Sequence, residues 1–176
     1  MSEMSISYSV PLIPQTSDHS CWAAGIAMIL AWKRGISIDP RTIAANRGSV
    51  SYMRQFRHGL DPEDTFILHR WGFILEAPQS YSPDDFAGLL ERYGPLWVAA
   101  SISEPHIRVV TGFKSAAGGP SFVIINDPWE EGMIAFRPSN RGSTYRRSYR
   151  RFTREVEHLA GDELGVTAPI YVAHLP

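Results

Sequence analysis

The chain has 176 residues, of which 44% are hydrophobic and 20% are charged, and its formal net charge is -1. This length and composition are typical of one globular domain with a substantial core, and the near-zero charge argues against gross affinity for nucleic acid or membrane surfaces. Cys21 is the single cysteine, so the fold must be stable without an internal disulfide.

The N-terminal segment has no basic start and no uninterrupted apolar core, which argues against a cleaved signal peptide and indicates synthesis in the cytoplasm without one. Only fourteen residues precede Gln15, so no inhibitory pro-segment is expected before it. The apolar run that follows Cys21 has eleven residues and is too short to cross a bilayer. We therefore expect no membrane span.

The first elements are a short strand and a long apolar helix. Residues 6–13 alternate loosely and predict a strand that Pro14 ends. The segment WAAGIAMILAW predicts a helix that begins at or just after Cys21 and stops at Gly35. Its competent N-cap residues are Ser17, Asp18 and Ser20, and its last turn carries Lys33 and Arg34.

Three further helices follow, each opened by an acidic or serine cap and a proline. Their predicted ranges are 41–46, ending near Gly48; 61–71, stopping at Gly72; and 82–93, stopping at Gly94. Residues 47–60 are expected to form a loop with a local packing cluster of Tyr52, Met53 and Phe56. The helical spacing assigns Leu68, Trp71, Phe86, Leu89 and Leu90 to the core.

From Pro95 onward the period changes to that of strands. Short runs rich in Val, Ile and Phe, separated by Gly, Pro, Ser and Asn, predict an antiparallel sheet. The predicted strands are 96–102, 106–113, 121–126, 133–137 and 170–175. The expected fold class is therefore α+β in a single domain over residues 1–176, with a helical half at about 15–94 and a β half at about 95–176.

Cys21 stands at the start of the apolar helix, where the positive end of the helix and a cationic neighbour favour a thiolate. This placement indicates a nucleophile. The alternative is a small buried hydrophobic residue, which a lone cysteine often is.

The residues around Cys21 resemble the active-site segment of the papain-like cysteine proteases. Gln15 lies six positions before the cysteine and Trp22 follows it, giving the pattern Q-x-x-x-x-x-C-W-A. In that family the glutamine completes the oxyanion hole with the N–H of the cysteine, so the resemblance implies this role for Gln15. Without its neighbours Gln15 would be interpreted as a solvated polar residue.

A catalytic cysteine needs a base, and His106 is the best placed of the six histidines because it stands at the start of a predicted strand. Asn126 and Asp127 end the next strand, and the resemblance implies that one of them orients the imidazole. Asp127 is the first choice and Asn126 the second, although Asp-Pro is also a common turn. The other histidines, His19, His58, His69, His158 and His174, are expected to be solvated or structural.

The order Gln15, Cys21, His106, Asp127 is closest to the compact bacterial branch of the family, which includes secreted effector proteases and peptidases of double-glycine leaders. The resemblance implies a papain-like fold, a Cys-His-Asp triad, a protein substrate, no cofactor and no metal. It further suggests an effector or toxin delivered into a target cell by a specialised secretion system, with a cognate inhibitor or immunity protein. Trp22 and Trp129 are candidates for lining the substrate cleft.

Two alternatives remain open for the chemistry: a cell-wall amidase or other acyl-transfer enzyme with the same Cys-His pair, and a catalytically silent binding module. Seven of the seventeen basic residues are arginines between Arg137 and Arg154. These arginines could dock an acidic protein surface, or they could form a solvated face. Nucleic acid is the less fitting partner, since basic and aromatic residues do not interleave there.

Overall fold

The computed structural model describes residues 3–45, 53–54, 56–57, 60, 66–101, 105–161 and 171–176. Its helices are α1 (Cys21–Arg34), α2 (Pro40–Ala45), α4 (Phe66–Arg70), α5 (Pro83–Tyr93) and α6 (Tyr149–Gly161). Its strands are β1 (Met4–Ser7), β2 (Ile74–Leu75), β3 (Leu96–Ser101), β4 (Pro105–Ser115), β5 (Ser121–Asp127), β6 (Ser143–Ser148) and β7 (Val172–His174).

The strands form one antiparallel sheet in the order β2-β7-β3-β4-β5-β6, which confirms the predicted sheet. The long strand β4 pairs with β3 over its first half and with β1 over its second half. The register of β4 against β5 shifts between Val110 and Gly112. A Cβ atom on Gly112 would lie 2.6 Å from the Ile6 carbonyl oxygen, so this close approach of β1 requires glycine.

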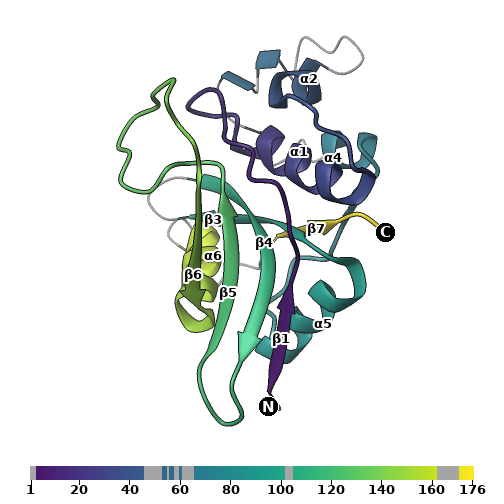
Figure 1. Cartoon of the computed structure of the whole chain (residues 1–176), viewed down its shortest axis with the longest axis vertical. Helices are drawn as coiled ribbons and strands as arrows, with labels where there is room; N and C mark the ends of the chain where they lie inside the picture. The colour runs from purple at the N-terminus through teal and green to yellow at the C-terminus, as the bar shows by residue number, and fades with distance from the viewer. Residues whose placement is uncertain are drawn as a thin grey trace.

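The two faces of the sheet are covered by different helices (Figure 1). The helices α1, α2 and α4 share a hydrophobic cluster with Trp97, Val109 and Ala173 of the sheet. The helices α5 and α6 share a second cluster with sheet residues such as Val98 and Val110. Because neighbouring residues of a strand point to opposite faces, one sheet supplies both clusters.

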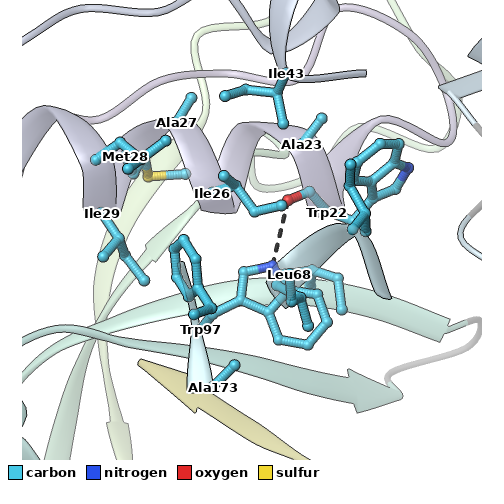
Figure 2. Close-up of a cluster of buried hydrophobic side chains, with 14 of the residues drawn as sticks. Trp22, Ala23, Ile26, Ala27, Met28, Ile29, Ile43, Leu68, Trp97 and Ala173 are labelled. Atoms are coloured by element: carbon cyan, nitrogen blue, oxygen red, sulfur yellow. Dashed lines mark hydrogen bonds between the residues drawn. The ribbon is translucent and has the colours of Figure 1, made fainter. Parts of the chain in front are cut away.

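The helix α1 is buried along most of its length and packs closely on the sheet. All residues from Cys21 to Ala31 are buried, as expected for a helix that is apolar on every side. Trp97 of β3 lies below the helix, and its indole Nε1 donates to the carbonyl oxygen of Trp22 at 3.2 Å (Figure 2). Gly25 makes this approach feasible, since a Cβ atom there would lie 2.8 Å from Trp97 Cδ1.

The local signals placed the ends of α1 and α5 correctly. Gly35 ends α1 in the left-handed region at φ 64°. Ser82 caps α5 by accepting from the Asp85 N–H, and Gly94 follows its last residue. The predicted core residues Leu68, Phe86 and Leu90 are fully buried.

Several predictions fall partly outside the described residues. The helix α2 begins at Pro40 and is described to Ala45, and α4 is described from Phe66. The predicted start of α4 near Asp61 lies outside the described residues. Tyr52 of the predicted loop also lies outside them. Residues 53–54 and 56–57 are helical where a loop was predicted, and Phe56 belongs to the α1 cluster.

The prediction of a strand over residues 133–137 is wrong. This segment lies in the connection between β5 and β6, and Ile134 is 96% exposed. The edge strand is instead the polar segment β6, whose backbone pairs with β5 from Asp127↔Ser143 to Phe122↔Ser148. Strands pair through backbone hydrogen bonds, which do not require apolar side chains. The polar sequence of β6 therefore forms a strand without the apolar alternation from which a strand is predicted.

The division into a helical and a β half is only approximate. The helix α6 lies in the second half, for which the sequence analysis predicted no helix. The short strands β1 and β2 lie before Gly94 yet belong to the sheet. The predicted strand over 6–13 is shorter and begins earlier, because β1 pairs only where it reaches the far end of β4. No helix in the described part of the chain is long and apolar enough to cross a membrane.

Candidate active site

Cys21 is the first residue of α1 and its side chain is nearly buried, with 8% of the residue exposed. The backbone N–H of Cys21 lies in the first helical turn, where it has no acceptor within the helix. Ser20 precedes it, but its side chain does not cap α1. The Ser20 hydroxyl oxygen instead accepts from the N–H groups of Thr16 and Ser17 and thereby orders the loop in front of the helix.

His106 connects the thiol with a carboxylate. It is the second residue of β4, and 17% of its side chain is exposed. Its Nε2 lies 2.6 Å from Oδ1 of Asp127, and its ring lies close enough to Cys21 for the thiol to raise the pKa of the imidazole. Because Nε2 is taken by the carboxylate, Nδ1 is the ring nitrogen left for the sulfur.

The electrostatics favour a protonated imidazole. Burial lowers the pKa of His106, but the hydrogen bonds with Asp127 and Cys21 and the charges of both partners outweigh burial and raise it from 6.5 to about 10. Burial would also raise the pKa of Asp127, yet the contacts with His106, Trp129 and Tyr145 lower it. At neutral pH the pair is therefore an imidazolium and a carboxylate.

Asp127 ends β5 and accepts three hydrogen bonds. Besides His106, the Trp129 N–H donates to Oδ1 at 2.9 Å and the Tyr145 hydroxyl donates to Oδ2 at 2.9 Å. The neighbouring Asn126 points elsewhere, because its amide donates to the Val10 carbonyl and accepts from Thr144. The structure thus brings Asp127, and not Asn126, to the imidazole.

Gln15 is 2% exposed and lies in the loop before α1. Its amide nitrogen donates to the carbonyl oxygens of Ser17 at 2.7 Å and Asp18 at 3.0 Å. Its buried Oε1 has no hydrogen-bond partner in the described part of the protein. Both N–H bonds of the side chain are thus directed into its own loop.

Asn140 ties the two loops of the site together and was missed by the sequence analysis. Its side-chain nitrogen donates to the carbonyl oxygens of Gln15 at 3.0 Å and Pro128 at 2.8 Å. Its Oδ1 accepts from the N–H groups of Glu130 and Gly142. A single amide therefore fixes the Gln15 loop against the turn that follows Asp127. An asparagine two positions before a glycine predicts only a turn, so the sequence held no signal for this contact.

The sequence analysis also missed Tyr145 of β6 and Arg108 of β4. Arg108 is fully buried, and its Nη1 donates to the Tyr145 hydroxyl at 3.2 Å. The one available signal was the position of an arginine inside the apolar string HIRVV, where a charge needs a partner.

The two tryptophans differ in exposure. Trp22 is 0% exposed and belongs to the α1 cluster, so its side chain offers no surface to a substrate. Trp129 is partly buried, and its indole donates to the Met133 carbonyl at 2.8 Å, which orders the loop after Asp127.

Each of the other histidines is exposed, bonded to another part of the fold, or outside the described residues. His19 and His69 are exposed. His174 is buried, contacts Oε1 of Glu76 at 2.7 Å and stacks on Tyr93 with ring centroids 3.7 Å apart, so it is structural. His58 and the side chain of His158 lie outside the described part. Within the described residues no group of three or more His, Cys, Asp or Glu side chains could hold a metal ion.

Comparison with solved structures supports the fold. A chain from a study of antibody cross-reactivity between the mite allergens Blo t 1 and Der p 1 is similar with a TM-score of 0.53 and 15% sequence identity. The match covers 94% of this chain and 66% of the allergen chain, so this chain spans just under two thirds of that length. At this identity the likeness shows the fold alone.

Comparison with protein families is more specific. A search of curated protein sequences gave no match. The family described as papain-like cysteine protease AvrRpt2 matches residues 4–141, a range that includes Gln15, Cys21, His106 and Asp127. The expected α+β, papain-like fold is thereby confirmed. The match covers well over half of the sequence, and the chain belongs to this family of papain-like cysteine proteases.

Proposed function

We propose that the protein hydrolyses peptide bonds of a protein substrate, with Cys21 as nucleophile, His106 as acid and base, and Asp127 as the group that orients His106. One observation carries the proposal: Nε2 of His106 bonds to Asp127 at 2.6 Å, and the same imidazole lies close enough to Cys21 for the thiol to raise the pKa of His106. This is the arrangement that activates a thiol for acyl transfer.

The reaction proceeds through an acyl enzyme. The Cys21 thiolate attacks the carbonyl carbon of the scissile bond, and the carbon–nitrogen bond breaks as His106 gives its proton to the leaving amine. The neutral imidazole then takes a proton from water, whose oxygen attacks the thioester. The carbon–sulfur bond breaks, the product acid leaves, and the thiolate and imidazolium are restored.

The oxyanion is stabilised by the Cys21 N–H at the start of α1 and by the Gln15 amide. For Gln15 to take this role, one of its N–H bonds must turn from a loop carbonyl to the substrate oxygen. The longer bond, to the Asp18 carbonyl at 3.0 Å, is the one we expect to yield. Asn140 donates to the backbone carbonyl oxygen of Gln15, so the backbone stays in place while the side-chain amide turns.

We further propose that the protein is a bacterial effector or toxin that acts inside a target cell, where a cognate inhibitor would control it. The support for this proposal is the order of Gln15, Cys21, His106 and Asp127 along the chain, which resembles that of secreted effector proteases.

The first experiment compares wild type with Cys21→Ala on a mixture of peptides made from a cell lysate. Mass spectrometry of new N-termini is expected to find cleavage by wild type and none by Cys21→Ala. His19→Ala is the matched control, since His19 is exposed and close in sequence to the nucleophile; it should cleave like wild type.

Other outcomes would favour the alternatives. Cys21-dependent cleavage of purified peptidoglycan without cleavage of any peptide would indicate a cell-wall amidase. Absence of both activities, with a Cys21 thiol that iodoacetamide labels no faster than a free thiol, would contradict the proposal and leave a binding module.

A further inference from the structure

Arg108 is the least expected residue of the central strand. It is 0% exposed, and its neighbours Ile107, Val109 and Val110 all belong to hydrophobic clusters. Burying a guanidinium ion is costly, and a buried ion pair is often no more stable than an apolar replacement. The contacts of Arg108 therefore call for an explanation other than stability.

The contacts of Arg108 lead to the carboxylate of Asp127. Its Nη1 donates to Glu155 Oε2 at 2.9 Å and to the Tyr145 hydroxyl oxygen at 3.2 Å. The Tyr145 hydroxyl in turn donates to Oδ2 of Asp127 at 2.9 Å. Because each group donates to the next, the positive charge on Arg108 polarises the tyrosine toward the carboxylate.

The network is anchored on α6. Glu155 lies 2.9 Å from Nε of Arg151 and 3.5 Å from Nε of Arg147, in addition to Arg108. The guanidinium of Arg147 also lies over the ring of Tyr145, 4.8 Å from its centroid. Tyr145 is thus held at its hydroxyl by Arg108 and at its ring by Arg147.

Tyr145 completes the set of donors that fixes the Asp127 carboxylate. Oδ1 faces His106 and the Trp129 N–H, while Tyr145 is the donor to Oδ2. Without that third bond the carboxylate could rotate about its side-chain torsion, and the imidazole that it holds would lose its fixed direction. The lowered pKa of Asp127 is in part an effect of this same hydroxyl.

We propose that Tyr145, held by Arg108, is a positioning residue that orients Asp127 and through it His106. The proposal rests on the proposed function, since it assigns Tyr145 a role in the same site. Tyr145 does not contact the sulfur; it acts through the carboxylate.

The test measures the rate at which iodoacetamide alkylates Cys21, followed by intact mass from pH 4 to pH 9. Cys21 is the single cysteine, so one adduct reports one site. Tyr145→Phe should lower the rate near pH 6 by roughly three- to tenfold, since the lost hydrogen bond acts on the sulfur only through Asp127 and His106 and so passes on part of its full effect. Tyr149→Phe is the matched control, because its buried hydroxyl donates to the carbonyl oxygens of Tyr81 and Ser82 and not to the site; it should react like wild type.

A double-mutant cycle separates positioning from a general structural effect. In the Asp127→Ala background Tyr145→Phe should change neither the rate nor the pH of half-maximal labelling, because the group through which it acts is gone. Unchanged labelling of the single variant would overturn the proposal. An equal loss in both backgrounds would also overturn it, since Tyr145 would then act by another route.

The wild-type protein tests the underlying function separately. A wild-type Cys21 that reacts no faster than a free thiol, and that His106→Ala does not slow, would contradict the proposed function. A reactive wild type with an unaffected Tyr145→Phe variant would contradict only the role of Tyr145.

Discussion

At the scale of single residues, the proposed chemistry depends on His106, because its imidazole bonds to the Asp127 carboxylate and lies near the Cys21 thiol. Cys21 at the start of a helix has a favourable position, but only a base at hydrogen-bond distance makes it a catalyst. The pKa of His106, raised to about 10, keeps the imidazole protonated over the neutral range. The protonated imidazole is the form that can give a proton to the leaving amine.

The pH dependence of activity follows from this pKa. For wild type, kcat/KM on a peptide identified as a substrate should fall as pH rises through about 10, where His106 loses its proton. Asp127→Asn keeps a hydrogen-bond acceptor but removes the negative charge, so the pKa of His106 should fall and the alkaline limb should move to lower pH. An alkaline limb that stays in place in Asp127→Asn would contradict the assignment.

The same shift predicts how stability depends on pH. A folded-state pKa raised from 6.5 to about 10 contributes stability that is complete below pH 6.5 and is lost as pH rises through 10. The decline in the free energy of unfolding over this range should be smaller in His106→Ala than in wild type, as measured by denaturant titration at several pH values.

Gln15 offers a second test at this scale. If its amide turns to the oxyanion, Gln15→Ala should lower kcat by roughly 10²- to 10³-fold with little change in KM. If the amide serves only its loop, the variant should lose stability and keep its turnover per folded molecule. Stopped assays with a cleaved peptide, together with thermal unfolding, distinguish the two. Thr16→Ala is a suitable control, because Thr16 is exposed and its hydrogen bond to the Ser20 hydroxyl oxygen comes from its backbone N–H.

At the scale of elements, the site depends on how closely α1 lies on the sheet. Gly25 faces the Trp97 indole. A Cβ atom on Gly25 would lie 3.1 Å from the side chain of Ile107, the residue after His106 in the sequence. The helix therefore sets the distance between Cys21 at its start and the first residues of β4. A shift of α1 away from the sheet would separate the sulfur from the imidazole.

Gly25→Ala should accordingly lower both activity and stability. Overpacking of this kind costs about 1–3 kcal/mol, and the displaced helix should also slow alkylation of Cys21. Gly88→Ala in α5 is the matched control, since nothing lies within 4 Å of its added Cβ. It should be neutral or stabilise the protein by up to about 1 kcal/mol. Thermal unfolding and labelling rates measure both effects, and a neutral Gly25→Ala would refute the close-packing argument.

At the scale of the whole molecule, one sheet separates two hydrophobic clusters. Phe86 lies at the centre of the α5–α6 cluster, with ring centroids of Tyr81, Tyr149 and Phe152 5.3 to 6.0 Å away. Cys21 belongs to the other cluster. If the chain is the single domain expected from its sequence, the two clusters should unfold together.

Phe86→Ala tests this expectation. The loss of a buried aromatic ring should lower the free energy of unfolding by about 3–5 kcal/mol. Because unfolding separates Cys21 from His106, the alkylation rate of Cys21 should change at the same denaturant midpoint as circular dichroism of the whole protein. A labelling midpoint that stays at the wild-type value would indicate two separately unfolding units.

The sequence alone determined the features that depend on near neighbours. Caps, stop glycines and apolar periodicity placed α1 and α5, because those signals act within one or two helical turns. Runs of Val, Ile and Phe located β3, β4 and β5. The candidates Cys21, His106 and Asp127 were found because their residue types and order on successive elements carry chemical information.

Tertiary structure alone decided the contacts between distant segments. One such contact is the pairing of β6, and not of residues 133–137, with β5. Others are the bond from Asn140 to Gln15, 125 positions away, and the link from Arg108 through Tyr145 to Asp127. Short-range patterns hold no record of these partners, because a polar side chain is satisfied by whichever group the fold places beside it. The network around the carboxylate therefore became visible only once the sheet had brought β4, β5 and β6 together.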